Sequence, residues 1–546
     1  MRKGWVVRSG ASLVAFVVAC CSGGVGIGQE PPVSTGGDVL GRQIRALVSD
    51  PEVVRAHWGV MVAGLDGTPI YALNEGQFFQ PASNAKLFTT AAALALLGPE
   101  ATFATKVVAR GVFTGSARLH GDAVLVGSGD ANLSGRAVPY VEPALRPRAA
   151  AGAAPLPRVE PLRYLAEMAD QIAASGLKQV DGDVVGDDTL FAWEPYPRDW
   201  AIDDAVWGYG APVSALSIND NQIQVTVTPG LRAGEAGVVT LDPAVPYYTV
   251  DSSGLLTGPT RSESRVQMER APGSKVLRVY GVMALDAKAD VEEVAIEDPA
   301  EYAAMALKGM LEARGIVVAG RARALHRPEV DLKGFLAESR EPFAGGLLGR
   351  SGLAQKLEEA RPGFQLLASH PSPGLDQDVG VTNKLSLNLH AELLLRQLGY
   401  RDGDDGTTAQ GARVVRAFLE QVGVDKDDVV FYDGSGLSGH DLVTPRAVAR
   451  LLEYAARQPW FAAYKASLPV GGVDGSLEGR FATGLLKGHV FAKTGTLGEA
   501  RALSGYLECA SGRTVVFSVM VNDHAPGTSA DRGVMDKIVE AVAAAN

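Results

Sequence analysis

The stretch FQPASNAKLFTTAAALALLG, residues 79–98, decides how the rest of this 546-residue chain is interpreted. Its Ala- and Leu-rich run favours a helix, because both residue types have a high intrinsic helix propensity. The run is apolar on most sides, which predicts a buried helix, and Gly98-Pro99 predicts its end. Ser83 and Lys86 stand three positions apart at the start of this helix, and the stretch contains no histidine.

Ser83 and Lys86 have the spacing of a serine nucleophile and its base. A serine hydroxyl attacks poorly until a base takes its proton, and a lysine can be that base when burial or nearby cations lower its pKa. Residues three apart share a helix face, and the helix N-terminus favours negative charge that develops on Ser83. Chance alone gives about one or two S-x-x-K matches in such a chain. A second match, Ser175 to Lys178, falls at a predicted helix end.

Two further motifs follow towards the C-terminus. Lys493-Thr494-Gly495-Thr496 lies in a predicted strand, where the lysine and hydroxyls can bind a carboxylate and the glycine lets a ligand approach the backbone. Ser386-Leu387-Asn388 precedes a predicted helix and offers a hydroxyl to pass a proton and an amide to bind a peptide carbonyl. Without a catalytic role, the Lys493 motif would be an exposed strand end and the Ser386 motif would be a helix cap. A competing copy of the second motif is Ser217-Ile218-Asn219.

Other candidate sites are less specific. The DGSGLS segment, residues 433–438, does not fit a G-x-S-x-G elbow and is interpreted as a Gly/Ser turn on the rim of the site. Gly127 to Asp130 lacks the rest of a phosphate-binding loop. The eight histidines have no metal-binding spacing, so neither a metal nor another cofactor is expected, and His390 and His440 are interpreted as structural.

The three motifs together form the S-x-x-K, S-x-N and K-T-G set of penicillin-recognising serine enzymes. With QPASNAKLFTTAAAL, YGAPVSALSINDNQIQV, FYDGSGLS and GGVDGSLEGRF, the chain resembles the D-alanyl-D-alanine carboxypeptidase/endopeptidase family of low-molecular-mass penicillin-binding proteins over roughly residues 40–545. The resemblance implies that Ser83 is the nucleophile, Lys86 its base and Ser386 a proton relay. The implied substrate-binding residues are Asn388, Lys493, Thr494, Gly495 and Thr496.

The resemblance also implies an α+β fold. A transpeptidase/β-lactamase-like domain, with an antiparallel sheet flanked by helices, would be interrupted by a long β-rich insertion. We expect a signal peptide at 1–28, a linker at 29–37, a catalytic domain made of 38–105 and 345–546, and an inserted region at 106–344. The Pro/Ala-rich stretch 135–161 within the insertion is expected to be a mobile surface segment.

The implied activity is that of a serine-type D-Ala-D-Ala carboxypeptidase and/or DD-endopeptidase. Its substrates would be peptidoglycan stem peptides or cross-links, cleaved through an acyl-enzyme, and β-lactams would be covalent inhibitors. Two alternatives stay open: a β-lactamase or esterase with the same serine-lysine chemistry, and a catalytically silent peptidoglycan-binding scaffold. The formal charge of −11 argues against a nucleic-acid partner.

The N-terminus predicts export from the cytoplasm. Arg2, Lys3 and Arg8 precede ASLVAFVVA at 11–19, an apolar run too short to cross a bilayer. VVAC at 17–20 resembles a bacterial lipobox, so a lipid on Cys20 and ordinary cleavage near Gly28 are both possible outcomes. We expect a periplasmic or cell-envelope protein that is either soluble or lipid-anchored. Cys509 is interpreted as a small buried hydrophobe.

Overall fold

The computed structural model describes residues 38–147, 159–330, 333–343, 347 and 364–546. The predicted signal peptide and linker, and residues 148–158 of the Pro/Ala-rich stretch, lie outside these residues. Within the described part of the chain, no helix is both long and apolar enough to span a membrane.

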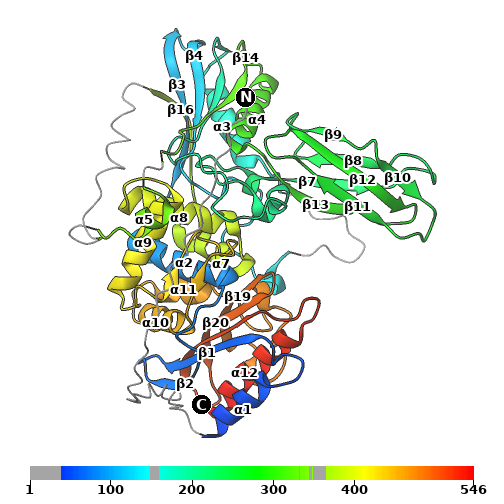
Figure 1. Cartoon of the computed structure of the whole chain (residues 1–546). Helices are drawn as coiled ribbons and strands as arrows, with labels where there is room; N and C mark the ends of the chain where they lie inside the picture. Colours follow the sequence, from blue (N-terminus) through cyan, green and yellow to red (C-terminus); the bar gives the residue numbers. More distant parts are fainter. Residues whose placement is uncertain (1–37, 148–158, 331–332, 344–346, 348–363) are drawn as a thin grey trace, which may run out of the picture. The chain divides into compact units, whose positions relative to one another are not determined.

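A five-stranded antiparallel sheet is built from both ends of the chain, in the order β19-β20-β21-β1-β2 (Figure 1). β1 pairs with β21 along its whole length, from His57 opposite Asn522 to Gly64 opposite Val515. Most residues of these strands are buried, because helices cover both faces. Helices α1 and α12 pack on one face, and α10 packs on the other. The bounds are α1 (Asp38–Val48), β1 (His57–Gly64), β2 (Pro69–Leu73), α10 (Pro445–Ala455), β19 (Val490–Leu497), β20 (Ala500–Glu508), β21 (Thr514–Asn522) and α12 (Ala530–Ala545).

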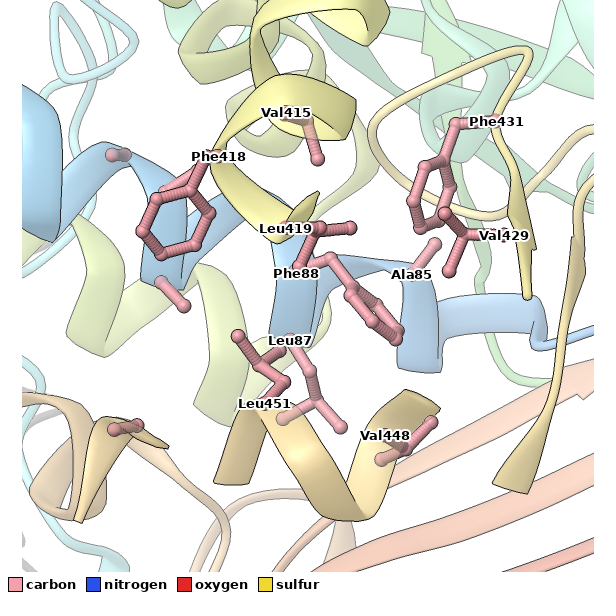
Figure 2. Packing of buried hydrophobic residues seen from close by; sticks show 14 of the residues in the cluster. Ala85, Leu87, Phe88, Val415, Phe418, Leu419, Val429, Phe431, Val448 and Leu451 are labelled. Carbon is pink, nitrogen blue, oxygen red and sulfur yellow. The ribbon is translucent and has the colours of Figure 1, made fainter. Parts of the chain in front are cut away.

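Helix α2 (Ala85–Leu96) lies at the centre of a group of helices that we call the helical half, and other helices of this group pack around it. Its first ten residues are all buried, as the apolar run predicts, and Gly98 follows with a φ of +89°. Figure 2 shows Leu87 and Phe88 packed against side chains of α9 and α10. The other elements of this half are α7 (Leu375–Leu385), α8 (Asn388–Asp402), α9 (Thr408–Gln421), α11 (Phe461–Ser467), β17 (Val429–Val430) and β18 (Leu442–Val443).

The inserted region contains a seven-stranded mixed sheet with two helices. Strands β14-β5-β4-β3-β16 form the main path, and β6 pairs in parallel with β4 and β15. Helices α3 and α4 bury apolar side chains against one face of this sheet, so the region is not built from strands alone. The bounds are β3 (Ala104–Thr114), β4 (Arg118–Val126), α3 (Arg163–Ala174), β5 (Gln179–Val180), β6 (Val184–Asp187), α4 (Pro299–Ala313), β14 (Val317–Val318), β15 (Ala322–Leu325) and β16 (Gln365–Pro371). Helix α5 (Phe335–Ser339) lies between β15 and β16 in the chain and packs against α9 of the helical half.

Two smaller sheets complete the inserted region. One has the order β13-β7-β8, and the other has the order β10-β12-β11 with β9 added to β12. Alternate residues of β7, such as Ile223, Val225 and Val227, are buried in the shared core, which is the period of a strand with one face inside. The bounds are β7 (Gln222–Thr228), β8 (Val238–Asp242), β9 (Thr249–Asp251), β10 (Leu255–Gly258), β11 (Arg265–Glu269), β12 (Val276–Ala284) and β13 (Asp290–Ala295).

The α+β class predicted from the sequence is confirmed, with an antiparallel sheet flanked by helices. The predicted domain division stays a proposal. The pairing of β16 with β3 extends the inserted sheet to Pro371, beyond the predicted boundary at 345. The first part of the Pro/Ala-rich stretch also differs from a purely surface segment. There, the Tyr140 hydroxyl accepts a hydrogen bond from the Gly475 backbone N–H at 3.1 Å.

Candidate active site

Ser83 lies in a short turn, η1 (Ala82–Asn84), immediately before α2, and Lys86 is the second residue of that helix. Lys86 Nζ is 3.0 Å from Ser83 Oγ, so the two groups point at each other. Ala82 has a φ of +45°, in the left-handed region that a non-glycine residue adopts only at a cost. Such strain is common beside reactive groups, because it fixes a side chain in one direction.

Two more acceptors surround the Lys86 amine. Its Nζ donates to Asn388 Oδ1 at 2.7 Å and to the Ser435 carbonyl oxygen at 2.7 Å. A neutral amine has two N–H bonds and one lone pair. When the two N–H bonds donate to the Asn388 and Ser435 oxygens, the lone pair can accept the Ser83 hydroxyl proton. Burial lowers the pKa of Lys86 to about 8, although the carboxyl groups of Asp433, Glu392 and Asp441 oppose this change.

A second buried lysine meets the second motif. Lys493 Nζ, on β19, donates to Ser386 Oγ at 2.8 Å and to the Thr494 carbonyl oxygen at 2.9 Å. Ser386 caps the C-terminus of α7 with a φ of +61°, which turns the chain sharply into α8. Burial holds the pKa of Lys493 well below its usual value, and the nearby Lys86 charge lowers it further.

The remaining residues of the third motif line the edge strand β19. Thr494 Oγ1 is 2.6 Å from Ser476 Oγ, and Thr496 is exposed. Gly495 lies against the Ser83 turn: a Cβ there would be 2.6 Å from the Pro81 carbonyl oxygen. The absence of a side chain is therefore what lets β19 approach the nucleophile so closely. The structure brings all eight predicted site residues to this place.

Sequence reasoning missed several residues that hold this arrangement. Asn84 Nδ2 donates to the Lys493 carbonyl oxygen at 3.0 Å and ties the Ser83 turn to β19. Asn388 Nδ2 donates to the Tyr209 carbonyl oxygen of the inserted region at 2.9 Å, which orients its amide towards Lys86. Main-chain acceptors such as Tyr209 leave no signal in a sequence. Asn84 stands beside Ser83, but the partner of its amide is 409 positions away.

The DGSGLS turn does not lie on the rim of the site, where its sequence predicts it. Asp433, Ser435 and Ser438 are almost fully buried, and the turn lies behind Lys86. Gly436 has a φ of +81°, and a Cβ there would collide with the Ala82 carbonyl oxygen at 1.8 Å. The turn therefore packs directly against the strained segment that presents Ser83.

The competing Ser217-Ile218-Asn219 motif and His390 have structural roles. Ser217 Oγ donates to the Ser214 carbonyl oxygen, and Asn219 Nδ2 donates to the Gln222 carbonyl oxygen, so both stabilise a turn of the inserted region. His390 is buried between Asp378 and Asp220. Burial alone would lower the pKa of His390, but these two carboxylates raise it to about 9. Within the described ranges, no group of three or more His, Cys, Asp or Glu side chains could hold a metal ion.

Comparisons with known proteins cover most of the chain. A family model described as the D-Ala-D-Ala carboxypeptidase 3 (S13) family matches residues 40–338 and 352–545. A D-alanyl-D-alanine carboxypeptidase from an Actinomadura strain is 32% identical over 497 residues, which cover 89% of this chain and 81% of that protein. The D-alanyl-D-alanine carboxypeptidase DacB from Haemophilus influenzae is 25% identical over 468 residues, or 83% of this chain and 82% of that protein.

A solved structure shares the fold. The crystal structure of penicillin-binding protein 4 from Haemophilus influenzae matches with a TM-score of 0.73 at 21% identity, and the match covers 91% of this chain and 98% of that one. The same protein has been solved in complex with a β-lactam, and that structure matches with a TM-score of 0.68 at 22% identity.

Proposed function

This chain belongs to the D-Ala-D-Ala carboxypeptidase 3 (S13) family, and from that premise we propose that it is a serine peptidase that cleaves D-Ala-D-Ala-type bonds of peptidoglycan peptides. It acts as a carboxypeptidase on stem peptides, as an endopeptidase on cross-links, or as both. The observation that carries the proposal is the 3.0 Å contact between Ser83 Oγ and the fully buried Lys86 amine.

Acylation begins with a proton transfer. The neutral Lys86 amine takes the Ser83 hydroxyl proton while Ser83 Oγ attacks the carbonyl carbon of the penultimate D-Ala. The carbonyl π electrons move to oxygen, and the backbone N–H groups of Ser83 and Thr496 are the proposed donors to that oxyanion. Removal of one such donor typically costs about 3 kcal/mol of transition-state stabilisation.

The leaving amine then needs a proton. Ser386 Oγ accepts a hydrogen bond from Lys493 Nζ at 2.8 Å, so its own hydroxyl proton is free to pass to the departing nitrogen. The proton that Lys86 took from Ser83 then replaces it on Ser386, and Lys86 is neutral again. The C–N bond breaks, and the terminal D-amino acid leaves with an amine. Lys493, Thr494 and Thr496 hold the substrate carboxylate, Gly495 leaves room for the peptide backbone, and Asn388 positions the peptide.

Water completes the cycle. A water molecule occupies the position of the departed amine, gives a proton to the same lysine-serine machinery and attacks the ester carbonyl. The ester C–O bond breaks and Ser83 regains its proton. A β-lactam presents a similar amide and carboxylate, so it acylates Ser83, but its leaving nitrogen stays tethered to the acyl group.

We also propose that the protein works in the cell envelope after export, because its substrate polymer lies there. The export signal falls in residues outside the structure. Mass measurement of the mature N-terminus distinguishes cleavage near Gly28 from a lipid on Cys20.

The decisive test is intact mass after incubation with a penicillin, followed by peptide mapping, beside hydrolysis of a D-Ala-D-Ala peptide and of cross-linked muropeptides. We expect one long-lived adduct on Ser83, and loss of both adduct and hydrolysis in Ser83→Ala. A label on another residue contradicts the assignment. Rapid turnover of the β-lactam supports the β-lactamase alternative. Retained hydrolysis in Ser83→Ala excludes Ser83 as the nucleophile.

A further inference from the structure

Three carboxyl groups are buried behind Lys86, and the mechanism above assigns none of them a role. Glu392 lies on α8, Asp433 opens the DGSGLS turn, and Asp441 follows that turn; each is at most 1% exposed. A buried charge is costly unless it is paired, so a cluster of three acids in a core requires an explanation.

Glu392 is linked to the base by a short chain of contacts. Its Oε1 accepts a hydrogen bond from the Gly434 backbone N–H at 2.9 Å. Thr89 Oγ1, on α2, donates to the Gly434 carbonyl oxygen at 2.8 Å, so Gly434 is held from two helices. The next residue, Ser435, offers its carbonyl oxygen to Lys86 Nζ at 2.7 Å. Glu392 also stands one helical turn after Asn388, the other oxygen partner of Lys86, on the same face of α8.

The charges around Glu392 are not balanced by an ion pair with it. Asp433 and Asp441 come from the turn segment, Lys86 from α2, and Arg396 from the next turn of α8. Arg396 is itself paired with Glu194 of the inserted region. Within the described chain, Glu392 Oε2 has no hydrogen-bond partner. Burial first, and then the Asp433 charge, raise the pKa of Glu392 to about 8.

Asp433 differs sharply from Glu392. Its two oxygens accept hydrogen bonds from the backbone N–H groups of Ser435, Gly436 and Ser438 and from the Trp200 indole at 2.6–3.0 Å, with Ser435 Oγ at 3.2 Å. Asp433 thus accepts five hydrogen bonds, whereas Glu392 accepts one from the Gly434 backbone N–H and lies close to the Ser435 hydroxyl, which lowers its pKa.

We propose that Glu392 is a positioning residue for Lys86: as a protonated carboxyl group it holds the DGSGLS turn against the base without adding a charge that would keep the lysine protonated. This rests on the proposed function, because it matters only if Lys86 acts as a base. The protonated state follows from the surroundings, since an ionised Glu392 would add a further buried charge beside Asp433.

The consequence for pH dependence follows from counting protons. When Lys86 and Glu392 together lose one proton, the pair can be neutral on both groups or can carry a charge on both. Only the neutral pair has a base. A substitution that forbids the charge on Glu392 lowers the pH at which Lys86 becomes neutral only if Glu392 is ionised at that pH in the parent enzyme.

The test measures the second-order rate constant for acylation by a fluorescent penicillin from pH 5.5 to 9.5. Glu392→Gln keeps an oxygen for the Gly434 N–H and cannot ionise. In the proposed state Glu392 is already protonated at pH 6.5, so we expect Glu392→Gln to keep the acidic limb of the parent enzyme and its rate at that pH to within about threefold. Glu392→Ala removes the acceptor, and we expect at least a tenfold loss of rate at every pH.

Glu453→Gln is the matched control, because Glu453 is a buried glutamate of the same half on α10, away from Lys86. We expect it to leave the acylation profile unchanged. The proposal is overturned if Glu392→Gln loses more than about threefold across the whole pH range, if its acidic limb moves to lower pH by more than about half a unit because Glu392 was ionised in the parent enzyme, or if a folded Glu392→Ala keeps the parent rate. Thermal unfolding shows whether Glu392→Ala is folded. If it is not, the acylation profile of Glu392→Gln alone tests the proposal. Failure of the proposed function gives a different result, namely no acylation of the parent enzyme.

Discussion

The active site and the inserted region both contain cationic side chains that are buried wholly or in part, but these side chains have opposite kinds of partner. In the inserted region Arg270 is paired with Glu297, and His326 lies between Asp188 at 2.9 Å and Asp298 at 3.1 Å. In the active site, Lys86 and Lys493 are buried close to each other, and their hydrogen-bond acceptors are hydroxyl, amide and carbonyl oxygens.

The pKa of the paired His326 is raised, whereas the pKa values of the two active-site lysines are lowered. Burial alone would lower the pKa of His326, but its hydrogen bonds to the two aspartates raise it to about 10. The pKa values of Lys86 and Lys493 are lowered, because burial is not offset by a direct ion pair. An ion pair keeps a side chain charged and has a structural role. A buried lysine without an ion pair has a lowered pKa and can therefore exchange a proton near neutral pH.

Loss of the active-site amine should have the largest effect. Lys86→Met fills the same space but cannot take a proton, and a positioned base contributes roughly 10²–10⁴ to a rate. We expect acylation by penicillin to fall by about 10³-fold while thermal stability is kept. Lys178→Met, at the exposed lysine of the second S-x-x-K match, should change neither quantity. A loss of less than tenfold in Lys86→Met would contradict the assignment of the base.

Loss of a paired cation should affect stability instead. Arg270→Met leaves Glu297 without its buried partner, and breaking such a pair typically costs about 3–5 kcal/mol. We expect urea unfolding to show this loss while the acylation rate constant of the folded protein is unchanged. Arg270→Met combined with Glu297→Gln should recover part of the stability. A normal urea midpoint in the single variant would show that the pair is not a structural element.

The two regions should also respond to pH with opposite signs. His326 has a folded-state pKa of about 10 against an ordinary value of 6.5, so its stabilising contribution is complete below 6.5 and is lost as the pH rises through 10. Lys86 has a folded-state pKa of about 8 against 10.5, so its contribution to stability rises between 8 and 10.5. His326→Gln should therefore flatten the decline of the melting temperature above pH 6.5. An unchanged slope would contradict the pairing.

The smallest effect is expected where the two regions touch. The Trp200 indole N–H donates to Asp433 Oδ2 at 2.9 Å and is one of five donors to that carboxylate. Trp200→Phe removes one donor and should lower the acylation rate constant by about three- to tenfold. Trp193→Phe, at a tryptophan stacked on His326, should leave acylation unchanged. Equal effects of the two substitutions would indicate a general loss of packing.

The sequence was informative where one segment carries its own signal. Helix α2 and strand β19 lie where the sequence predicted a buried helix and a strand, because a continuously buried segment has a continuous apolar pattern. The motif residues were predicted because their chemistry demands particular side chains at short spacings. The Ser435 and Tyr209 carbonyl oxygens could not be predicted, since any residue type supplies a carbonyl. Glu392 gave no signal because its partner, Gly434, is 42 positions away and contributes a backbone N–H.

The pairing of β1 with β21 has a consequence for how the chain becomes active. β1 begins at residue 57 and its partner ends at residue 522, so the central sheet closes only after nearly the whole chain has been synthesised. Closing such a long loop carries an entropic penalty that must be met before the contacts stabilise the fold. The nucleophile and Lys493 belong to opposite sides of this closure. A nascent chain that has not reached β19 therefore carries Ser83 but lacks the strand that supplies Lys493 to its site.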